Sequence, residues 1–140
     1  MNGNVISFTI EGNVQAQQRP RFRRIGKGVQ TYDPKESAEY KKYVAKVAKE
    51  YAPEQLIESK ILLFIDVYIK IPKSYTKKQR EEILNNNNAH LKKPDVDNLA
   101  KGIKDGITGV IWKDDSLINE LHIRKFYCSD EPRAEIKIEW

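Results

Sequence analysis

The sequence has few of the features that mark secreted, membrane-spanning or zinc-binding proteins. Its one cysteine, Cys128, cannot form a disulfide within the chain, which is typical of the reducing cytosol. No apolar run approaches the roughly 20 residues of a membrane-spanning helix, and the start resembles no signal peptide. His90 and His122 lack the spacing of zinc ligands. We therefore expect a cytoplasmic protein with no membrane association and no organic small-molecule cofactor.

The length and composition favour one small folded domain. A chain of 140 residues with 39% hydrophobic and 32% charged residues can bury a core and is not compositionally disordered. Val5–Ile10 is predicted as a first strand, and Ile61–Ile71 as a central strand because its first half is apolar on both faces. Glu120–Cys128 and Ala134–Ile138 are predicted as a closing pair of strands, with the turn at residues 130–132 between them.

Three segments carry helical patterns. Asp33–Glu36 is typical of a helix start, with Asp33 as the N-cap and Pro34 in the first position, and Pro53 ends this helix. Residues 76–84 favour a short helix, and Asp95–Thr108 a second main helix in which two glycines, Gly102 and Gly106, allow close packing. The expected buried stripes are Tyr40, Val44, Val47 and Tyr51 in the first helix, and Val96, Leu99, Ala100, Ile103 and Ile107 in the last.

The net charge of +5 is unevenly distributed along the chain. Residues 14–32 contain five basic side chains and no acid, in a segment that favours a loop or an irregular hairpin, and residues 70–93 contain seven basic residues and two acids. Residues 94–140 contain seven basic and ten acidic residues. A single basic block is as consistent with a solvated face as with a binding site, but two such blocks suggest a polyanionic partner.

Several carboxylates gather around the start of the last predicted helix. Asp95 is well placed to be a simple helix N-cap, because the positive end of the helix dipole stabilises a carboxylate there. Asp97, Lys101 and Asp105 share one face, which is consistent either with an i,i+4 ladder of ion pairs or with a metal ligand next to a phosphate-binding lysine. A helical wheel places them away from the buried stripe.

The adjacent acids Asp114 and Asp115 alone would be interpreted as a turn. Together with Asp95, Asp97, Lys101 and the two basic blocks, they form a set suited to phosphodiester hydrolysis. Carboxylate oxygens bind Mg²⁺ or Mn²⁺, such a metal activates water and neutralises phosphate charge, and basic side chains hold the flanking phosphates.

The same residues resemble those of a known family. Lys93–Leu99, followed by Lys101, Trp112 and Asp114–Asp115, is similar to the RusA family of Holliday-junction resolvases, which are small nucleases common in prophages. The stretch Arg19–Phe22 resembles the N-terminal signature of that family, and the resemblance extends from about residue 5 to residue 138.

The resemblance implies a homodimer with an α/β (α+β) fold, in which helices pack on a mixed sheet. It also implies Mg²⁺-dependent cleavage of four-way DNA junctions, with Mn²⁺ as a substitute metal. The family pattern maps its metal-binding carboxylates onto Asp95, Asp97 and Asp115, with Asp114 as the alternative third ligand, and its catalytic lysine onto Lys101. The expected DNA-binding residues are basic: Arg19, Arg21, Arg23, Arg24, Lys27, Lys73, Lys77, Lys78, Lys92 and Lys93.

Three other functions remain consistent with the sequence. A non-catalytic protein could bind branched DNA and keep the acidic patch for structure. A nuclease could act on other substrates, such as flaps, replication forks or RNA. A protein-interaction module of phage origin could use the basic blocks to bind an acidic partner.

Overall fold

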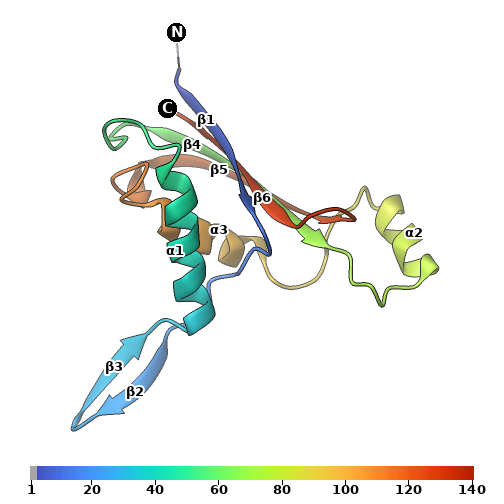
Figure 1. Ribbon diagram of the computed structural model, residues 1–140, viewed down its shortest axis with the longest axis horizontal. Coiled ribbons are helices and arrows are strands. Elements are labelled where there is room, and N and C mark those ends of the chain that lie inside the picture. The colour runs from blue at the N-terminus through green and yellow to red at the C-terminus, as the bar shows by residue number, and fades with distance from the viewer. Residues whose placement is uncertain (1–2) are drawn as a thin grey trace.

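The computed structural model describes residues 3–140, which fold around one four-stranded sheet (Figure 1). The strand order is β1-β6-β4-β5, and β2 and β3 form a separate hairpin. Because β4 runs parallel to β5 and antiparallel to β6, the sheet is mixed, as expected. The strands are β1 Val5–Glu11, β2 Arg21–Ile25, β3 Gly28–Tyr32, β4 Ile61–Lys70, β5 Ile118–Cys128 and β6 Arg133–Glu139.

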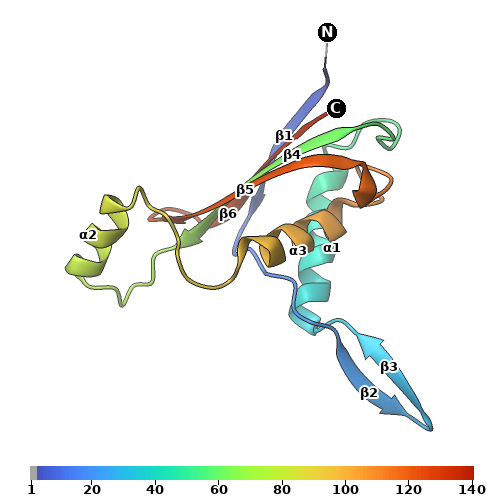
Figure 2. The same cartoon turned by 180° about the vertical axis from the view of Figure 1, so that it is seen from behind.

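Three α-helices accompany the sheet. α1 (Lys35–Lys49) and α3 (Val96–Ile107) lie on the same face of it, whereas α2 (Lys77–Asn85) lies apart, at the opposite end of the molecule from the β2–β3 hairpin (Figures 1 and 2). A short 3₁₀ turn, η1 (Asp115–Leu117), precedes β5. Within residues 3–140, no helix is long and apolar enough to cross a membrane.

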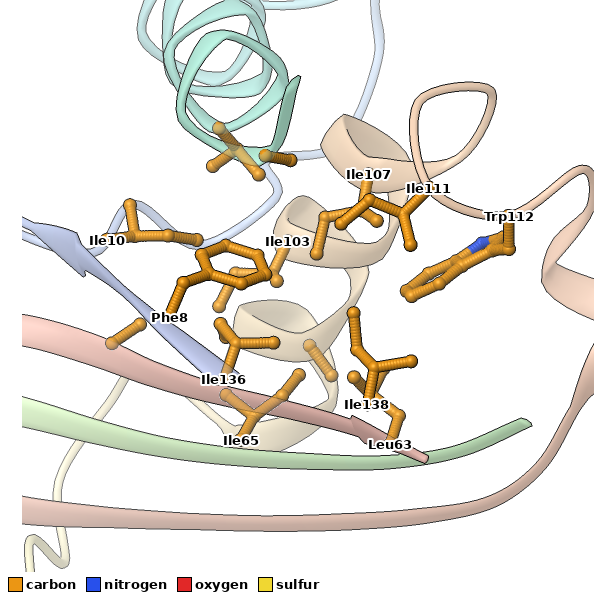
Figure 3. Packing of buried hydrophobic residues seen from close by; sticks show 14 of the residues in the cluster. Phe8, Ile10, Leu63, Ile65, Ile103, Ile107, Ile111, Trp112, Ile136 and Ile138 are labelled. Atoms are coloured by element: carbon orange, nitrogen blue, oxygen red, sulfur yellow. The ribbon is translucent and has the colours of Figure 1, made fainter. Parts of the chain in front are cut away.

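The core lies between the sheet and the two covering helices (Figure 3). β4 has neighbours on both sides, so the prediction of a central strand is confirmed. Its side chains alternate: every second residue, from Ile61 to Val67, is buried under the helices, and the residues between them are half-buried on the other face. Trp112, which has no exposed surface, closes the core beyond the end of α3.

The two glycines of α3 permit close contacts with neighbouring backbone, as predicted. A Cβ atom on Gly106 would come within 2.7 Å of Val44 on α1, and one on Gly102 would come within 3.1 Å of the Gln15 carbonyl oxygen. α1 and the chain that leads into the hairpin therefore approach α3 to a distance that a larger residue would prevent.

The start and end of α1 differ from the sequence expectation. Pro34, not Asp33, occupies the N-cap position, and no side chain caps the helix. Asp33 instead accepts a hydrogen bond from Lys41, two turns into α1, which gives its carboxylate a cationic partner. Tyr51 was predicted in the buried stripe but lies beyond the helix end and is 44% exposed, where its ring stacks on Phe8 at 5.0 Å.

Two other expectations need correction. β5 and β6 do not pair with each other, because β4 lies between them and bonds to both. The four-residue connection at residues 129–132 therefore passes the end of β4. Val96 was predicted in the buried stripe of α3 but is 36% exposed, because it occupies the first helical position, at the rim of the core. The other four members of that stripe are buried.

Candidate active site and nucleic-acid interface

Two free carboxylates stand at the start of α3. Asp95 occupies the N-cap position, but its side chain makes no capping hydrogen bond. Asp97, in the first helical turn, is exposed, as is Asp95. Within the described part of the chain, neither side chain has a hydrogen-bond or ion-pair partner. Simple helix capping therefore does not account for Asp95, and both carboxylates are available to a ligand beside the positive end of the helix dipole.

The segment that leads into α3 is fixed to the edge of the sheet. β5 is an edge strand, and part of its free edge is covered by an isolated bridge between Ala89 and Phe126 and by a hydrogen bond from the Tyr127 amide to the Asn88 carbonyl. Further along, the Lys125 ammonium donates hydrogen bonds to the carbonyl groups of Lys92 and Pro94, the latter at 2.8 Å. These contacts hold the backbone immediately before Asp95.

Lys101, one turn after Asp97, belongs to a chain of alternating charges. Its ammonium lies 3.1 Å from Asp105, and Asp105 lies 3.6 Å from Lys41 on α1. Lys41 also contacts Asp33 at 2.6 Å, and the Lys41 ammonium holds the pKa of the Asp33 carboxyl below its usual value. The predicted ladder is therefore only half formed, because Lys101 pairs with Asp105 and not with Asp97.

A small polar pocket opens beside this chain of charges. Its volume is about 280 Å³, and it lies between α1, α3 and the base of the hairpin. The pocket contains both lysines and both acids of the charge network, together with the amide side chains that precede the hairpin. The lining residues are Gln17, Gln18, Arg19, Pro20, Asp33, Lys41, Asn98, Lys101 and Asp105. Lys101 therefore lines a small concave site.

The third predicted ligand, Asp115, lies at the other end of α3. One of its carboxylate oxygens accepts hydrogen bonds from the Thr108 hydroxyl and from the Trp112 indole, the latter at 3.1 Å. Thr108 follows Asp97 by eleven residues, or about 16 Å of helix. Asp114 is also occupied, since it accepts a hydrogen bond from the Ser116 amide that lowers its pKa.

A single chain therefore does not assemble the three carboxylates. Among residues 3–140, no group of three or more His, Cys, Asp or Glu side chains is placed to hold a metal ion. Asp95 and Asp97 alone still fit Mg²⁺, because this ion is usually bound by one or two carboxylates together with substrate phosphates and water. Their free oxygen atoms supply the hard ligands that it prefers.

The hairpin and α2, each of which carries part of one predicted basic block, lie at opposite ends of the molecule (Figures 1 and 2). The hairpin presents exposed basic residues, and Arg19 lies at its base in the polar pocket. The second block is exposed on α2 and on the segments that flank it. The ten predicted DNA-binding residues are all exposed: Arg19, Arg21, Arg23, Arg24, Lys27, Lys73, Lys77, Lys78, Lys92 and Lys93.

Three residues around the site were not identified from the sequence. Lys125 clamps the segment before Asp95, and Lys41 and Asp33 extend the charge network of Lys101. No local pattern marks Lys125 or Lys41, which contact distant segments of the chain. The local pattern around Asp33 predicts a helix N-cap and gives no sign of its ion pair with Lys41.

Two comparisons with known proteins each match nearly the whole chain. The family described as Endodeoxyribonuclease RusA matches residues 11–139, which include both basic blocks and the acidic residues of α3 and η1. A protein of Bacillus subtilis (strain 168), named Uncharacterized protein YqaN, is 41% identical over 135 residues, which cover 95% of this chain and 94% of the relative. The chain belongs to the RusA family of endodeoxyribonucleases.

Proposed function

We propose that this protein is a Mg²⁺-dependent, structure-selective endodeoxyribonuclease that resolves four-way DNA junctions by paired, symmetric nicks. The observation that supports it most directly is the free Asp95 carboxylate at the N-cap position of α3, beside the equally free Asp97. Family membership supports the nuclease chemistry, and the two basic blocks are suited to hold phosphates on either side of α3.

In this proposal Asp95 and Asp97 hold the metal, for which Mn²⁺ is a substitute. When bound, the ion supplies neutralisation of phosphate charge and activation of water for hydrolysis. Lys101, one helical turn from Asp97, places an ammonium beside the phosphate and stabilises the charge that develops on its oxygens. The pair with Asp105 restrains that ammonium, which reduces the entropy lost when substrate binds.

In this proposal Asp115 completes the site of the other subunit in a homodimer. Asp97 and Asp115 lie near opposite ends of α3, so a twofold axis that brings two α3 helices side by side and antiparallel sets each Asp97 near Asp115 of the partner subunit. Such a dimer has two equivalent sites, which matches the symmetry of a four-way junction and the paired nicks.

Mixing two inactive variants tests this shared site. If Asp97 and the partner's Asp115 act together, a heterodimer of Asp97→Asn and Asp115→Asn chains contains one intact site and one doubly altered site. The mixture should recover single-strand nicking that neither variant has alone. If each site is confined to one chain, the mixture stays inactive.

Cleavage of a labelled synthetic junction tests the function itself. Wild-type protein should cut it with Mg²⁺ or Mn²⁺ but not with EDTA, and Asp97→Asn should abolish cutting while preserving junction binding and the circular dichroism spectrum. Glu36→Gln is the matched control, because Glu36 is also an exposed acidic residue in the first turn of a helix, in this case α1.

The other outcomes identify the alternatives. If the protein binds the junction but cuts it with none of the divalent metals tested, it is a non-catalytic junction-binding protein. Equal cleavage of flaps or replication forks indicates a nuclease with a different target. Full activity in Asp97→Asn contradicts the metal site.

A further inference from the structure

The β2–β3 hairpin projects from the body of the protein and has no core of its own (Figures 1 and 2). Its strands pair from Arg21 opposite Tyr32 to Ile25 opposite Gly28, and every residue in both strands is exposed. A two-stranded ribbon of this kind is at best marginally stable alone. Its exposed side chains therefore gain stabilisation from whatever binds them.

The two faces of the ribbon differ. On one face, Arg23 donates a hydrogen bond to Gln30 at 2.8 Å and lies 5.4 Å from the centroid of the Tyr32 ring, so these side chains already have partners. The opposite face presents Phe22, opposite Thr31, and Val29, opposite Arg24. Phe22 is 70% exposed and Val29 is 69% exposed.

The charge of the segment indicates what covers this apolar face. Residues 14–32 contain five basic side chains and no acid. A partner with a dense negative exterior and an apolar interior complements both the charge and the exposed apolar side chains. DNA has this combination, since charged phosphates surround stacked bases, and proteins insert apolar side chains such as Phe between base steps.

The base of the hairpin is fixed to α3. The backbone amide of Gln17 donates a hydrogen bond to the backbone carbonyl of Asn98 at 3.0 Å, and Asn98 is the residue after Asp97. At the other end of the hairpin, Asp33 contacts Lys41, which reaches Asp105 beside Lys101. The base of the hairpin, before β2 and after β3, is thus tied to the helix that carries the candidate active site.

We propose that Phe22, supported by Val29, inserts between bases at the branch point of the DNA while the basic residues of the hairpin hold the adjacent phosphates. Stacking is already interrupted at a branch point, so insertion costs less there than in a continuous duplex. The hairpin would thereby select branched DNA and set the position of the strand relative to α3. This inference rests on the proposed function, because it requires a DNA substrate.

Fluorescence of 2-aminopurine reports insertion without any cleavage. The base analogue is placed at the branch point of a junction or in the middle of one arm, and wild-type protein is added in EDTA. We expect the fluorescence to rise at the branch point only, because the analogue loses a stacking neighbour. Phe22→Ala should remove the rise and weaken junction binding by about 5- to 150-fold, the usual range for loss of one base–aromatic stack. Phe22→Trp should retain both.

Val5→Ala is the matched control, because Val5 is also an exposed apolar side chain, at 57%, but lies on β1, outside both basic blocks. It should behave as wild type. An undiminished signal in Phe22→Ala overturns the inference, even when cleavage proceeds normally and the proposed function holds. A change of oligomeric state in Phe22→Ala, seen by sedimentation without DNA, also overturns it, because the apolar face would then be covered by a second copy. Absence of DNA binding by the wild type instead contradicts the proposed function.

Discussion

The ammonium group of Lys125 donates a hydrogen bond to the carbonyl of Pro94, at 2.8 Å, one residue before the first carboxylate of the candidate site. It also donates to the Lys92 carbonyl, so one side chain of β5 holds two carbonyl groups of the segment that leads into α3. The backbone amide of Gln17 also holds the start of α3, through a hydrogen bond to the Asn98 carbonyl. Lys125 therefore positions Asp95 and Asp97 through the backbone and does not contact their carboxylates.

Replacement of Lys125 by Met should loosen the start of α3 while preserving the packing of the side-chain stem. We expect the free energy of unfolding to fall by about 1 kcal/mol, the usual net value of a hydrogen bond. Cleavage should require a higher Mg²⁺ concentration, because the two carboxylates are less well ordered. Urea unfolding and a Mg²⁺ titration of the cleavage rate measure the two effects. Lys137→Met on β6 removes another strand lysine, far from α3 in sequence, and should leave the Mg²⁺ requirement unchanged. An unchanged requirement in Lys125→Met would refute the positioning role.

Replacement of Asp105 by Asn should reduce the rate of the chemical step. Lys101 loses its ion-pair partner at 3.1 Å, and Lys41 loses one of its two acids. A poorly placed ammonium should lower kcat by about 10- to 100-fold, with little change in KM, since we propose that the basic blocks provide most of the junction binding. Glu39→Gln breaks an i,i+4 pair of the same spacing, Lys35–Glu39 on α1, and should leave kcat unchanged. A rise in KM at constant kcat would instead indicate that Asp105 serves DNA binding.

Replacement of Gly106 by Ala should destabilise the contact between α1 and α3. The added methyl group would lie 2.7 Å from the Val44 side chain, closer than atoms in a packed core approach. We expect a loss of about 1–3 kcal/mol in the free energy of unfolding, typical of an overpacked core. Gly28→Ala is the control, because its Cβ would meet its nearest neighbour at 3.6 Å. Urea unfolding of both variants compares the losses, and equal stability of Gly106→Ala and wild type would disprove the tight contact.

Protonation of His90 should destabilise the fold in mild acid. Burial lowers the pKa of this imidazole, with smaller contributions from the cations of Lys125 and Lys92, and the ring packs against Tyr127 at 4.6 Å. The unfolded chain has an ordinary histidine pKa of about 6.5. Below that pH the unfolded state binds the proton more readily, so the contribution to stability is complete above about pH 6.5 and is lost as the pH falls towards the folded pKa. His90→Phe keeps an aromatic ring and should show a smaller loss of stability between about pH 6.5 and pH 5 than wild type does. Parallel curves for the two proteins would contradict this origin.

Local patterns were sufficient for most elements. The run Ile61–Ile65, which is apolar on both faces, predicts a central strand, and the helical spacing of Leu99, Ile103 and Ile107 predicts the face that α3 buries. Two predictions failed where tertiary contacts overrode local preferences. Asp33 forms an ion pair with Lys41 instead of capping α1, and β4 lies between β5 and β6, which follow one another in the chain. Strand order depends on long-range pairing, which a linear pattern does not encode.

The sequence by itself determined which side chains gather at the start of α3. Asp95, Asp97 and Lys101 lie within seven residues, so a regular helix fixes their spacing whatever surrounds it. Only the tertiary structure decided which distant residues contact this segment and which predicted ligand lies away from it. Lys125, Lys41 and Asp33 reach the site from other elements, whereas Asp115 is engaged with Thr108 and Trp112 at the far end of the helix. The physical reason is that helix geometry is set by adjacent residues, whereas contacts between distant segments depend on how the sheet and helices pack as a whole.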